Sequence, residues 1–339
     1  MTRNPPGDLP GLGLFPYLMA LGIILGAATA SAQSFDPVTT RAAGMAGAFV
    51  AVTDDASAVY WNPAALASGA FFSLLIDRTS AEATLDEPAD SRGGSRSGTI
   101  LALSTPPFGL SYYRLRSTWI SPSPTQNGMS VSETLITHHT GATLVHSLTR
   151  GLSVGATLKL VRGIATSTEV PSGSIDDLLD EANDLVGEAT NKFDADVGVS
   201  VVAGTLRAGL TMRNVTSPKF DAAGGGPPVQ LERQARAGVG LTSPLGFLVA
   251  LDVDLNTIRG PIGNLRDLAL GTEARVLKRA FARGGFRMNT LGNEPGGHAP
   301  TYSVGGSFAV LTSLWIDAQA TMGSEAGSRG WGVAARVAF

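Results

Sequence analysis

The sequence predicts an all-β protein, a transmembrane antiparallel β-barrel of about 14 strands with an N-terminal hatch. Three observations predict this fold. Apolar and polar residues alternate with period two in many segments of roughly ten residues. The connections between these segments alternate between short and long, and the chain ends on an alternating segment whose last residue is aromatic.

The chain divides into three parts: an export signal over residues 1–32, a hatch over residues 33–70 and a barrel over residues 71–339. The signal contains the one long uninterrupted apolar stretch, residues 12–28, and ends at Ala30-Ser31-Ala32. That triplet has the A-x-A pattern of a signal peptidase site. We therefore expect a cleaved signal peptide and a location in the bacterial outer membrane.

Residues 41–69 do not alternate as a membrane strand does, because small residues and short helical pieces dominate them. A barrel of about 14 strands is too wide for the side chains of its own wall to fill. We expect this segment to lie inside the barrel or under its periplasmic mouth.

The barrel strands are predicted from alternation. In residues 247–256, for example, Phe247, Val249 and Leu251 share one face while Asp252 and Asp254 share the other. With an even number of strands, the two ends of the barrel's polypeptide chain lie on the same side of the membrane. The expected strands are residues 71–78, 98–104, 107–116, 132–147, 152–164, 192–202, 206–216, 231–242, 247–256, 266–277, 280–288, 302–310, 314–322 and 331–339.

Connection lengths support a membrane barrel over a soluble sandwich. Outer-membrane barrels have short periplasmic turns and longer outside loops. Short connections are expected at residues 105–106, 149–151, 203–205, 243–245, 278–279 and 311–313. Long connections are expected at residues 79–97, 117–131, 165–191, 217–230, 257–265, 289–301 and 323–330.

The polar face of the strands is expected to line a wet lumen. Two pairs of carboxylates resemble those used in acid/base catalysis or calcium binding: Asp194 with Asp196, and Asp252 with Asp254. Residues two apart on a strand share a face, however, so we interpret them as lumen residues that pair with arginines on neighbouring strands. The expected inward charged residues are Lys159, Asp194, Asp196, Arg207, Arg213, Glu232, Arg236, Asp252, Asp254, Asp267, Glu273, Arg275, Asp317 and Arg336.

Residues 174–188, in the longest outside loop, change from period two to the helical period. Ser174 followed by Asp177 fits a helix cap. Two interpretations stay open: the helix packs over the barrel mouth, or it forms part of an apolar docking site for a ligand or partner. Its apolar face consists of Ile175, Leu178, Leu179, Ala182, Leu185 and Val186.

The C-terminal segment alternates up to the last residue of the chain, Phe339. A terminal aromatic residue on an alternating strand resembles the signal that the barrel assembly machinery reads. The candidate signal consists of Trp331, Val333, Val337 and Phe339.

Composition excludes several classes of site. The chain has no cysteine, which excludes disulfides, thiolate metal sites and cysteine nucleophiles. Its formal net charge of −3 lacks the basic footprint of a nucleic-acid partner.

No catalytic constellation is found in the sequence. Residues 151–155 match the G-x-S-x-G pattern of serine hydrolases, but that pattern needs a strand, a turn and a helix, whereas here it opens a strand. His138 and His139 point to opposite faces of one strand, so they do not suggest a metal site. We expect no enzyme activity, no metal and no cofactor.

Residues 44–67, GMAGAFVAVTDDASAVYWNPAALA, resemble the N-terminal signature of the FadL-like superfamily of outer-membrane proteins, including its PorV/PorQ branch. The resemblance covers this motif closely and the rest of the chain loosely. It implies a fourteen-stranded barrel with an N-terminal hatch, in which Asn62-Pro63-Ala64 matches the NPA element. The implied hatch residues are Gly44, Gly47, Asp54, Asp55, Asn62, Pro63 and Ala64.

Two roles for the NPA element stay open. Pro63 lacks an amide donor and the Asn62 amide can bond nearby backbone groups, so the pair suits the end of a short helix. The alternative role is to hold or switch the hatch.

The resemblance implies passive transport of hydrophobic small molecules, because in FadL-type transporters these molecules pass from an outside groove into the barrel and leave sideways through its wall. The alternative is a PorV-like, non-enzymatic partner of a protein secretion or surface-attachment system, favoured by the shorter chain and the 6% aromatic content. Expected partners are outer-membrane lipid, the barrel assembly machinery, and either a hydrophobic small-molecule ligand or a secreted protein.

Overall fold

The computed structural model describes residues 38–85, 92–123, 125–182, 187–259, 264–292, 300–323 and 328–339. The predicted export signal, residues 1–32, and residues 33–37 of the predicted hatch lie outside the described residues.

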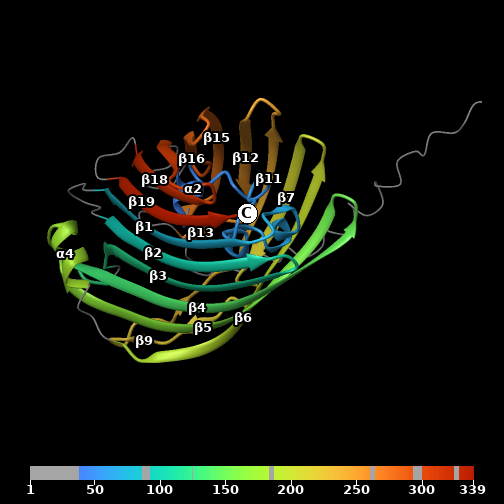
Figure 1. Cartoon of the computed structure of the whole chain (residues 1–339). Coiled ribbons are helices and arrows are strands. Elements are labelled where there is room, and N and C mark those ends of the chain that lie inside the picture. Colours follow the sequence, from blue (N-terminus) through green and yellow to red (C-terminus); the bar gives the residue numbers. More distant parts are fainter. Residues whose placement is uncertain are drawn as a thin grey trace, which may run out of the picture. The chain divides into compact units, whose positions relative to one another are not determined.

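Fourteen antiparallel strands form one closed sheet, which confirms the predicted fold class (Figure 1). Sequence neighbours pair with one another around the sheet, and the pairing of β1 with β19 completes the ring. The fourteen strands are β1 (Ser73–Leu85), β2 (Arg92–Thr105), β3 (Phe108–Pro122), β4 (Met129–Thr149), β5 (Leu152–Pro171), β6 (Ala189–Ala203), β7 (Leu206–Arg213), β11 (Gln234–Thr242), β12 (Phe247–Asp254), β15 (Asp267–Leu277), β16 (Ala280–Asn289), β17 (Pro300–Ala309), β18 (Leu314–Gly323) and β19 (Arg329–Ala338).

Short elements fill the connections. The strand pieces are β8 (Lys219–Phe220), β9 (Ala222–Ala223), β10 (Val229–Gln230), β13 (Ile258–Arg259) and β14 (Asn264–Leu265). The helices are α2 (Thr40–Ala43), α3 (Ala58–Trp61), the 3-10 helix η2 (Pro63–Ser68) and α4 (Ile175–Glu181). In the part of the chain that the structure describes, no helix is both long and apolar enough to cross a membrane.

Every predicted strand segment corresponds to one strand of the ring, but β1 to β6 are longer than predicted, whereas β7, β11 and β12 are shorter. β4 begins at Met129 and β5 continues to Pro171, beyond the predicted limits of 132 and 164. The prediction ended each strand where apolar alternation stops, whereas strand pairing depends on backbone groups and continues through serine, threonine and glycine.

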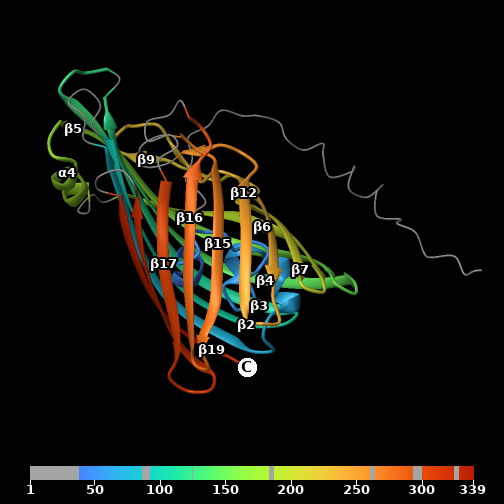
Figure 2. The same ribbon diagram turned by 90° about the horizontal axis from the view of Figure 1, so that it is seen from above.

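The alternation of connections is confirmed. Each short connection joins strands at one end of the barrel, and the longer connections, such as those between β5 and β6 and between β7 and β11, lie at the other end. We call these the short-turn end and the long-loop end. In Figure 2 compact turns between neighbouring strands lie together at one rim of the barrel.

The outer face of the barrel carries the apolar half of the alternation. Along β12 the side chains alternate between exposed and buried, with Val249, Leu251 and Val253 exposed and Asp252 and Asp254 buried. A closed sheet pairs its backbone groups internally, and an apolar exterior suits lipid. The strands therefore have the two properties that a membrane-spanning sheet needs.

The two ends of the sheet meet beside the C-terminus. Phe339 follows β19, and its backbone N–H and C=O bond the C=O and N–H of Phe72 at 3.1 and 3.0 Å. The two rings stack with centroids 5.1 Å apart. Trp331, Val333 and Phe339 point outward and are at least half exposed. Their proposed reading by the assembly machinery stays a prediction.

Helix α4 is shorter than predicted and lies against the outside of the wall. It ends at Glu181, and Ser174 precedes it without forming a side-chain cap. Its buried Ile175, Leu178 and Leu179 pack on Ile120. Ile120 lies on the outward side of β3, since the neighbouring Trp119 packs among lumen residues.

Two further contacts give the same placement. A Cβ added at Gly93, which is paired with Ile120, would meet the Ile175 side chain, and Arg116 donates to the carbonyl of Ala182 at 2.8 Å. The interpretation that this helix covers the barrel mouth is therefore wrong. The predicted apolar residues Leu185 and Val186 lie outside the described residues.

We predict that a charge on the outer apolar face destabilises the barrel. Val304 on β17 is 63% exposed between Tyr302 and Phe308. Val304→Arg should lower the free energy of unfolding by about 2 to 4 kcal/mol, because the guanidinium faces hydrocarbon. Urea unfolding in lipid vesicles, followed by tryptophan fluorescence, measures the loss.

The matched control is Leu245→Arg. Leu245 is 88% exposed in the turn between β11 and β12, where water solvates a charge. Equal losses for the two variants would contradict a lipid-facing position of Val304.

Candidate functional site

The N-terminal segment occupies the barrel lumen. Residues 38–69, here called the hatch, contain α2, α3 and η2, and Figures 1 and 2 show this blue segment enclosed by the strands. Met45, Phe49 and Trp61 are fully buried, and they belong to one core cluster with wall residues such as Ile100 and Tyr113. The hatch therefore packs as part of the barrel interior.

The NPA element shapes the hatch and joins it to the wall. Asn62 ends α3, and its Oδ1 accepts from the Ala64 amide at 3.1 Å while Pro63 begins η2. The Asn62 Nδ2 donates to the carbonyls of Val50 in the hatch and Val199 in β6, at 3.1 and 3.0 Å. One side chain thus ends a helix, starts the next and bonds the wall.

Glycines in the wall make room for the hatch backbone. A Cβ at Gly155 would lie 2.5 Å from the amide nitrogen of Ala64, and one at Gly198 would lie 2.1 Å from Asn62 Oδ1. Gly209 and Gly271 face Val50 and Met45 equally closely, at 2.7 and 2.6 Å from their carbonyl oxygens. These four lumen-facing glycines therefore leave space for the hatch backbone.

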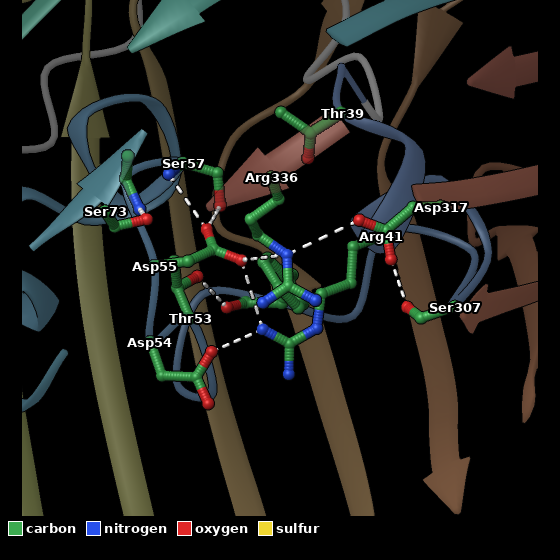
Figure 3. Close-up of polar contacts among 12 residues, drawn as sticks. Thr39, Arg41, Thr53, Asp54, Asp55, Ser57, Ser73, Ser307, Asp317 and Arg336 are labelled. Atoms are coloured by element: carbon green, nitrogen blue, oxygen red, sulfur yellow. Dashed lines mark hydrogen bonds and ion pairs between the residues drawn. The ribbon is translucent and has the colours of Figure 1, made fainter. Parts of the chain in front are cut away.

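Arg41 is the centre of an ion-pair network between hatch and wall (Figure 3). Within the hatch it bonds Asp54 and lies 3.2 Å from Asp55 Oδ2. Across the interface its Nη2 and Nε donate to the two oxygens of Glu273 on β15, at 2.9 and 3.0 Å. Such two-point contacts between guanidinium and carboxylate fix orientation as well as distance.

The wall continues this network. Arg283 on β16 donates to Glu273 Oε2 at 2.5 Å and lies 3.3 Å from Asp317 Oδ1 on β18. Arg336 on β19 lies 3.4 Å from Asp317 Oδ2 and 3.7 Å from Asp55 Oδ2. Three arginines and four carboxylates thus link the hatch to four strands.

The network sets the charge state of the hatch. Burial alone would raise the pKa of Asp55, but the guanidinium groups of Arg336 and Arg41 outweigh it, so the pKa lies below its ordinary value. Burial opposes the charge of Arg41 too, yet its three carboxylate neighbours raise the pKa. Both groups are therefore ionised at neutral pH.

Two wall aspartates accept hydrogen bonds from the hatch backbone and do not pair with a basic residue of the hatch. Asp77 on β1 accepts from the amide and hydroxyl of Thr40, at 2.7 and 2.9 Å. Asp252 on β12 accepts from the amides of Phe49 and Val50, both at 2.9 Å. These carboxylates satisfy amides that the short hatch turns leave unpaired.

A polar layer lies beside the hatch in the lumen. The buried Lys159 bonds Asp194 and Asp196 on β6 at 3.0 and 2.6 Å. Arg213 on β7 stacks over the Tyr60 ring of the hatch with 3.5 Å to its centroid. The carboxylates of β6 therefore pair across strands as expected, although their principal partner is a lysine.

The other predicted aspartate pair is split between two roles. Asp254 bonds Arg236 at 2.6 Å, as predicted, whereas Asp252 binds hatch amides. Among the described residues no group of three histidine, cysteine, aspartate or glutamate side chains is arranged to hold a metal ion.

An apolar cluster lies in the lumen toward the long-loop end. The ring of Phe220 sits where a Cβ of Gly163 on β5 would lie, at 2.3 Å. The connection between β7 and β11 thus turns inward and covers the wall. The cluster consists of Trp119, Leu135, Val161, Ala165, Phe220, Val229 and Leu231, with Ala222 at its margin.

The predicted hatch residues are brought together inside the barrel, with different surroundings. Gly44 packs on Gly305 of β17, with a Cβ 3.3 Å from its Cα, and the Gly47 carbonyl accepts from Arg236 at 3.2 Å. The Asp54 side chain stays 39% exposed. Sequence reasoning missed Arg41, although it is the one charged residue between positions 38 and 53.

A family described as "F plasmid transfer operon, TraF, protein" matches residues 132–254, which is a part of the barrel only. No curated protein matches the chain.

Solved structures with the same fold include a monoaromatic hydrocarbon channel, CymD, with 14% identity, a TM-score of 0.63 and coverage of 89% of this chain and 97% of that one. The Ralstonia pickettii toluene transporter TbuX has 14% identity and a TM-score of 0.60, covering 89% and 98%. A Pseudomonas aeruginosa FadL homologue has 12% identity and a TM-score of 0.60, also covering 89% and 98%. At these identities the likeness establishes a shared fold.

We predict that two of the three carboxylate partners of Arg41, Glu273 and Asp54, differ in importance. Glu273 is buried and serves two arginines, so Glu273→Gln should weaken hatch docking by about 3 kcal/mol. Asp54 is partly exposed, so Asp54→Asn should cost less than about 1 kcal/mol. Trypsin cleavage after Arg41, followed by mass spectrometry, should accelerate about 100-fold in the first variant. Equal rates in the two variants would show that burial does not govern this interface.

We predict that hatch docking survives mild acid. Because the folded-state pKa of Asp55 is depressed, its stabilising contribution is complete above the ordinary value of 3.8 and is lost as pH falls through the lower folded value. The urea midpoint should lose the Asp55 contribution only below about pH 4. Asp55→Asn should lower the midpoint at pH 7 and remove this part of the acid dependence; an unchanged profile would contradict it.

Proposed function

We propose that this protein is an outer-membrane channel through which hydrophobic small molecules cross by passive diffusion past the hatch. The short-turn end then faces the periplasm and the long-loop end faces outside. The proposal requires neither a cofactor nor a chemical step. Its structural neighbours of low identity support the fold on which the proposal rests, and several of them are hydrocarbon channels or transporters.

The observation that carries the proposal is the construction of the lumen. The closed wall surrounds the hatch, which is held in place by non-covalent contacts. The apolar cluster lies on the side of the hatch that faces the long-loop end. Because the side chains of so wide a ring do not close its lumen, a barrier to free permeation needs such an insert. The apolar cluster offers hydrophobic molecules a dry surface ahead of the charged hatch interface.

The strand pairing supports a route along the lumen. Register shifts occur between Ser147 and Thr149 and between Arg275 and Leu277, both beside short turns. The pairings of β1 with β2, β2 with β3 and β3 with β4 run without a register shift. A molecule that left sideways through the wall would have to separate paired strands. Exit along the lumen by displacement of the hatch therefore has the lower free-energy barrier.

A disulfide that locks the hatch to the wall tests this function. A Cβ at Gly240 on β11 would lie 3.8 Å from the Cβ of Val52 in the hatch, which matches disulfide geometry. The chain has no cysteine of its own, so Val52→Cys with Gly240→Cys creates a single defined pair. Uptake of toluene into proteoliposomes should fall to the protein-free rate on oxidation and recover on reduction.

The two single-cysteine variants are the matched controls and should transport toluene under both redox conditions. If vesicles that contain the wild-type protein take up toluene no faster than protein-free vesicles, the channel function is refuted. Full transport through the oxidised double variant would retain the channel but refute passage by hatch displacement.

A second candidate function is a non-enzymatic role as partner of a transfer or secretion system. The partial match to a family named for a plasmid transfer operon favours it, over residues 132–254. This role resembles the PorV-like alternative, with a secreted or surface protein bound at the outer rim. Cross-linking in whole cells would support it by joining a protein to rim positions such as Asp176, and transport by wild-type proteoliposomes would favour the channel.

A further inference from the structure

A row of polar residues crosses the outside of the barrel wall. Directly paired positions on six neighbouring strands, β1 to β6, carry basic side chains at every second strand. We call this set the basic row. It consists of Arg78, Thr99, Arg114, His138, Arg162 and Asn191.

The basic row faces outward. Arg114 lies between the buried lumen residues Tyr113 and Leu115, and Arg162 lies between the buried Val161 and Gly163. Because side chains alternate between the two faces of a strand, the arginines project from the opposite face. Arg78 and Arg162 are exposed and Arg114 is half-buried.

Apolar rows lie directly on the short-turn side of the basic row. On β3, Phe108, Leu110 and Tyr112 precede Arg114 and are 60%, 57% and 45% exposed. On β5, Leu158 and Leu160 precede Arg162. The row immediately beneath consists of Ile76, Leu101, Tyr112, Thr140, Leu160 and Phe193. The basic row thus marks the upper border of the lipid-facing band on these strands.

The arginines of the row have no carboxylate partners in the part of the chain that the structure describes. Arg78 bonds the hydroxyl of Thr99 at 2.8 Å, and no ion pair joins it, Arg114 or Arg162 to an acidic residue. By contrast the lumen arginines Arg236 and Arg283 are paired with aspartate or glutamate. The row therefore presents uncompensated positive charge at the lipid boundary.

The row of basic residues does not continue past β1. Continuing from Arg78 across β19, β18 and β17, the paired outward positions are Val333, Ala318 and Gly306. Helix α4 lies just beyond the row, where Arg116 donates to the carbonyl of Ala182, the residue that follows the helix. The wall thus has a basic strip between an apolar band and a helix.

We propose that the basic row binds the phosphorylated glucosamine headgroup of an outer-leaflet lipid A-type glycolipid. The outward-facing residues of a membrane barrel have lipid molecules as their neighbours. At the border of the apolar band, the anionic group of a lipid is its headgroup phosphate. The long-loop end faces the outer leaflet in the orientation proposed above, and there phosphorylated glycolipid is the anionic lipid.

The chemistry of the row fits this occupant. Arginine forks bind phosphate oxygens at two points. Arg114 lies two strands from Arg78 and two strands from Arg162, hence about 10 Å from each, so neighbouring arginines suit more than one phosphate on a single headgroup. Tyr112 and His138, linked at 2.8 Å, and Thr99 and Asn191 add groups that hydrogen-bond sugar hydroxyls. The apolar rows beneath receive the acyl chains.

This inference uses the orientation of the proposed channel but not its transport. Lipid binding at the outer wall requires neither hatch movement nor an open lumen. A channel without lipid binding, and lipid binding without a channel, are therefore distinguishable results.

The test compares two charge-matched triple variants of the full mature chain in detergent. Arg78→Gln, Arg114→Gln and Arg162→Gln remove the row's arginines. Arg150→Gln, Lys278→Gln and Arg279→Gln remove the same charge from exposed positions in short turns. Native mass spectrometry measures binding of bisphosphorylated lipid A, and the heat-dependent gel shift of folded barrels verifies that both variants fold.

We expect the row variant to bind lipid A about 100-fold more weakly than wild type, or about fivefold for each arginine, and the turn variant to bind within twofold of wild type. Lipid A stripped of both phosphates should bind all three proteins equally weakly. Inorganic phosphate at millimolar concentration should not displace the lipid. Equal loss in the two variants, full displacement by inorganic phosphate, or equally tight binding of phosphatidylglycerol would each overturn the proposal.

Discussion

Closure of a fourteen-stranded ring is the constraint on which the rest of this structure depends. Pairing β1 with β19 removes both sheet edges, which a lipid environment demands, but it also encloses more space than the wall's side chains can fill. The interior therefore has to be built from something else. Here the N-terminal segment and an inward-turned connection supply it, and the wall is shaped to receive them through glycines such as Gly155 and Gly285.

The interior is held mostly by charged side chains that form ion pairs. Each buried basic group of the interface meets a carboxylate on another element, as Arg41 meets Glu273 and Lys159 meets Asp196. Removing water from one member of such a pair is costly, so the pairs fix where the elements sit rather than adding much net stability. Asp252 follows the same logic with peptide amides in place of a cation.

The ring itself could be predicted from the sequence because each strand has to present one face to lipid and the other to the lumen. That requirement leaves alternation at every strand, as in residues 247–256. The Asn62-Pro63 turn was likewise visible, because a proline restricts local backbone geometry and needs no distant partner.

The partners of the hatch could not be predicted, because contacts such as that between Arg41 and Glu273 join residues 232 positions apart. Nothing in the local pattern specifies which inward carboxylate a hatch residue meets. The strand ends were missed for a different reason, since pairing in β4 continues after its apolar alternation stops. The placement of α4 failed because an apolar helix face does not record which side of the wall it covers.

The junction between hatch and wall has a consequence for kinetics. Only residues 69–72 separate η2 from β1, and the Ala70 amide is bonded back to the Asp54 carbonyl at 3.2 Å. A displaced hatch thus remains tethered at high effective concentration beside its own binding surface. Re-docking of a hatch displaced in this way would be a unimolecular event, so its rate would not depend on protein concentration.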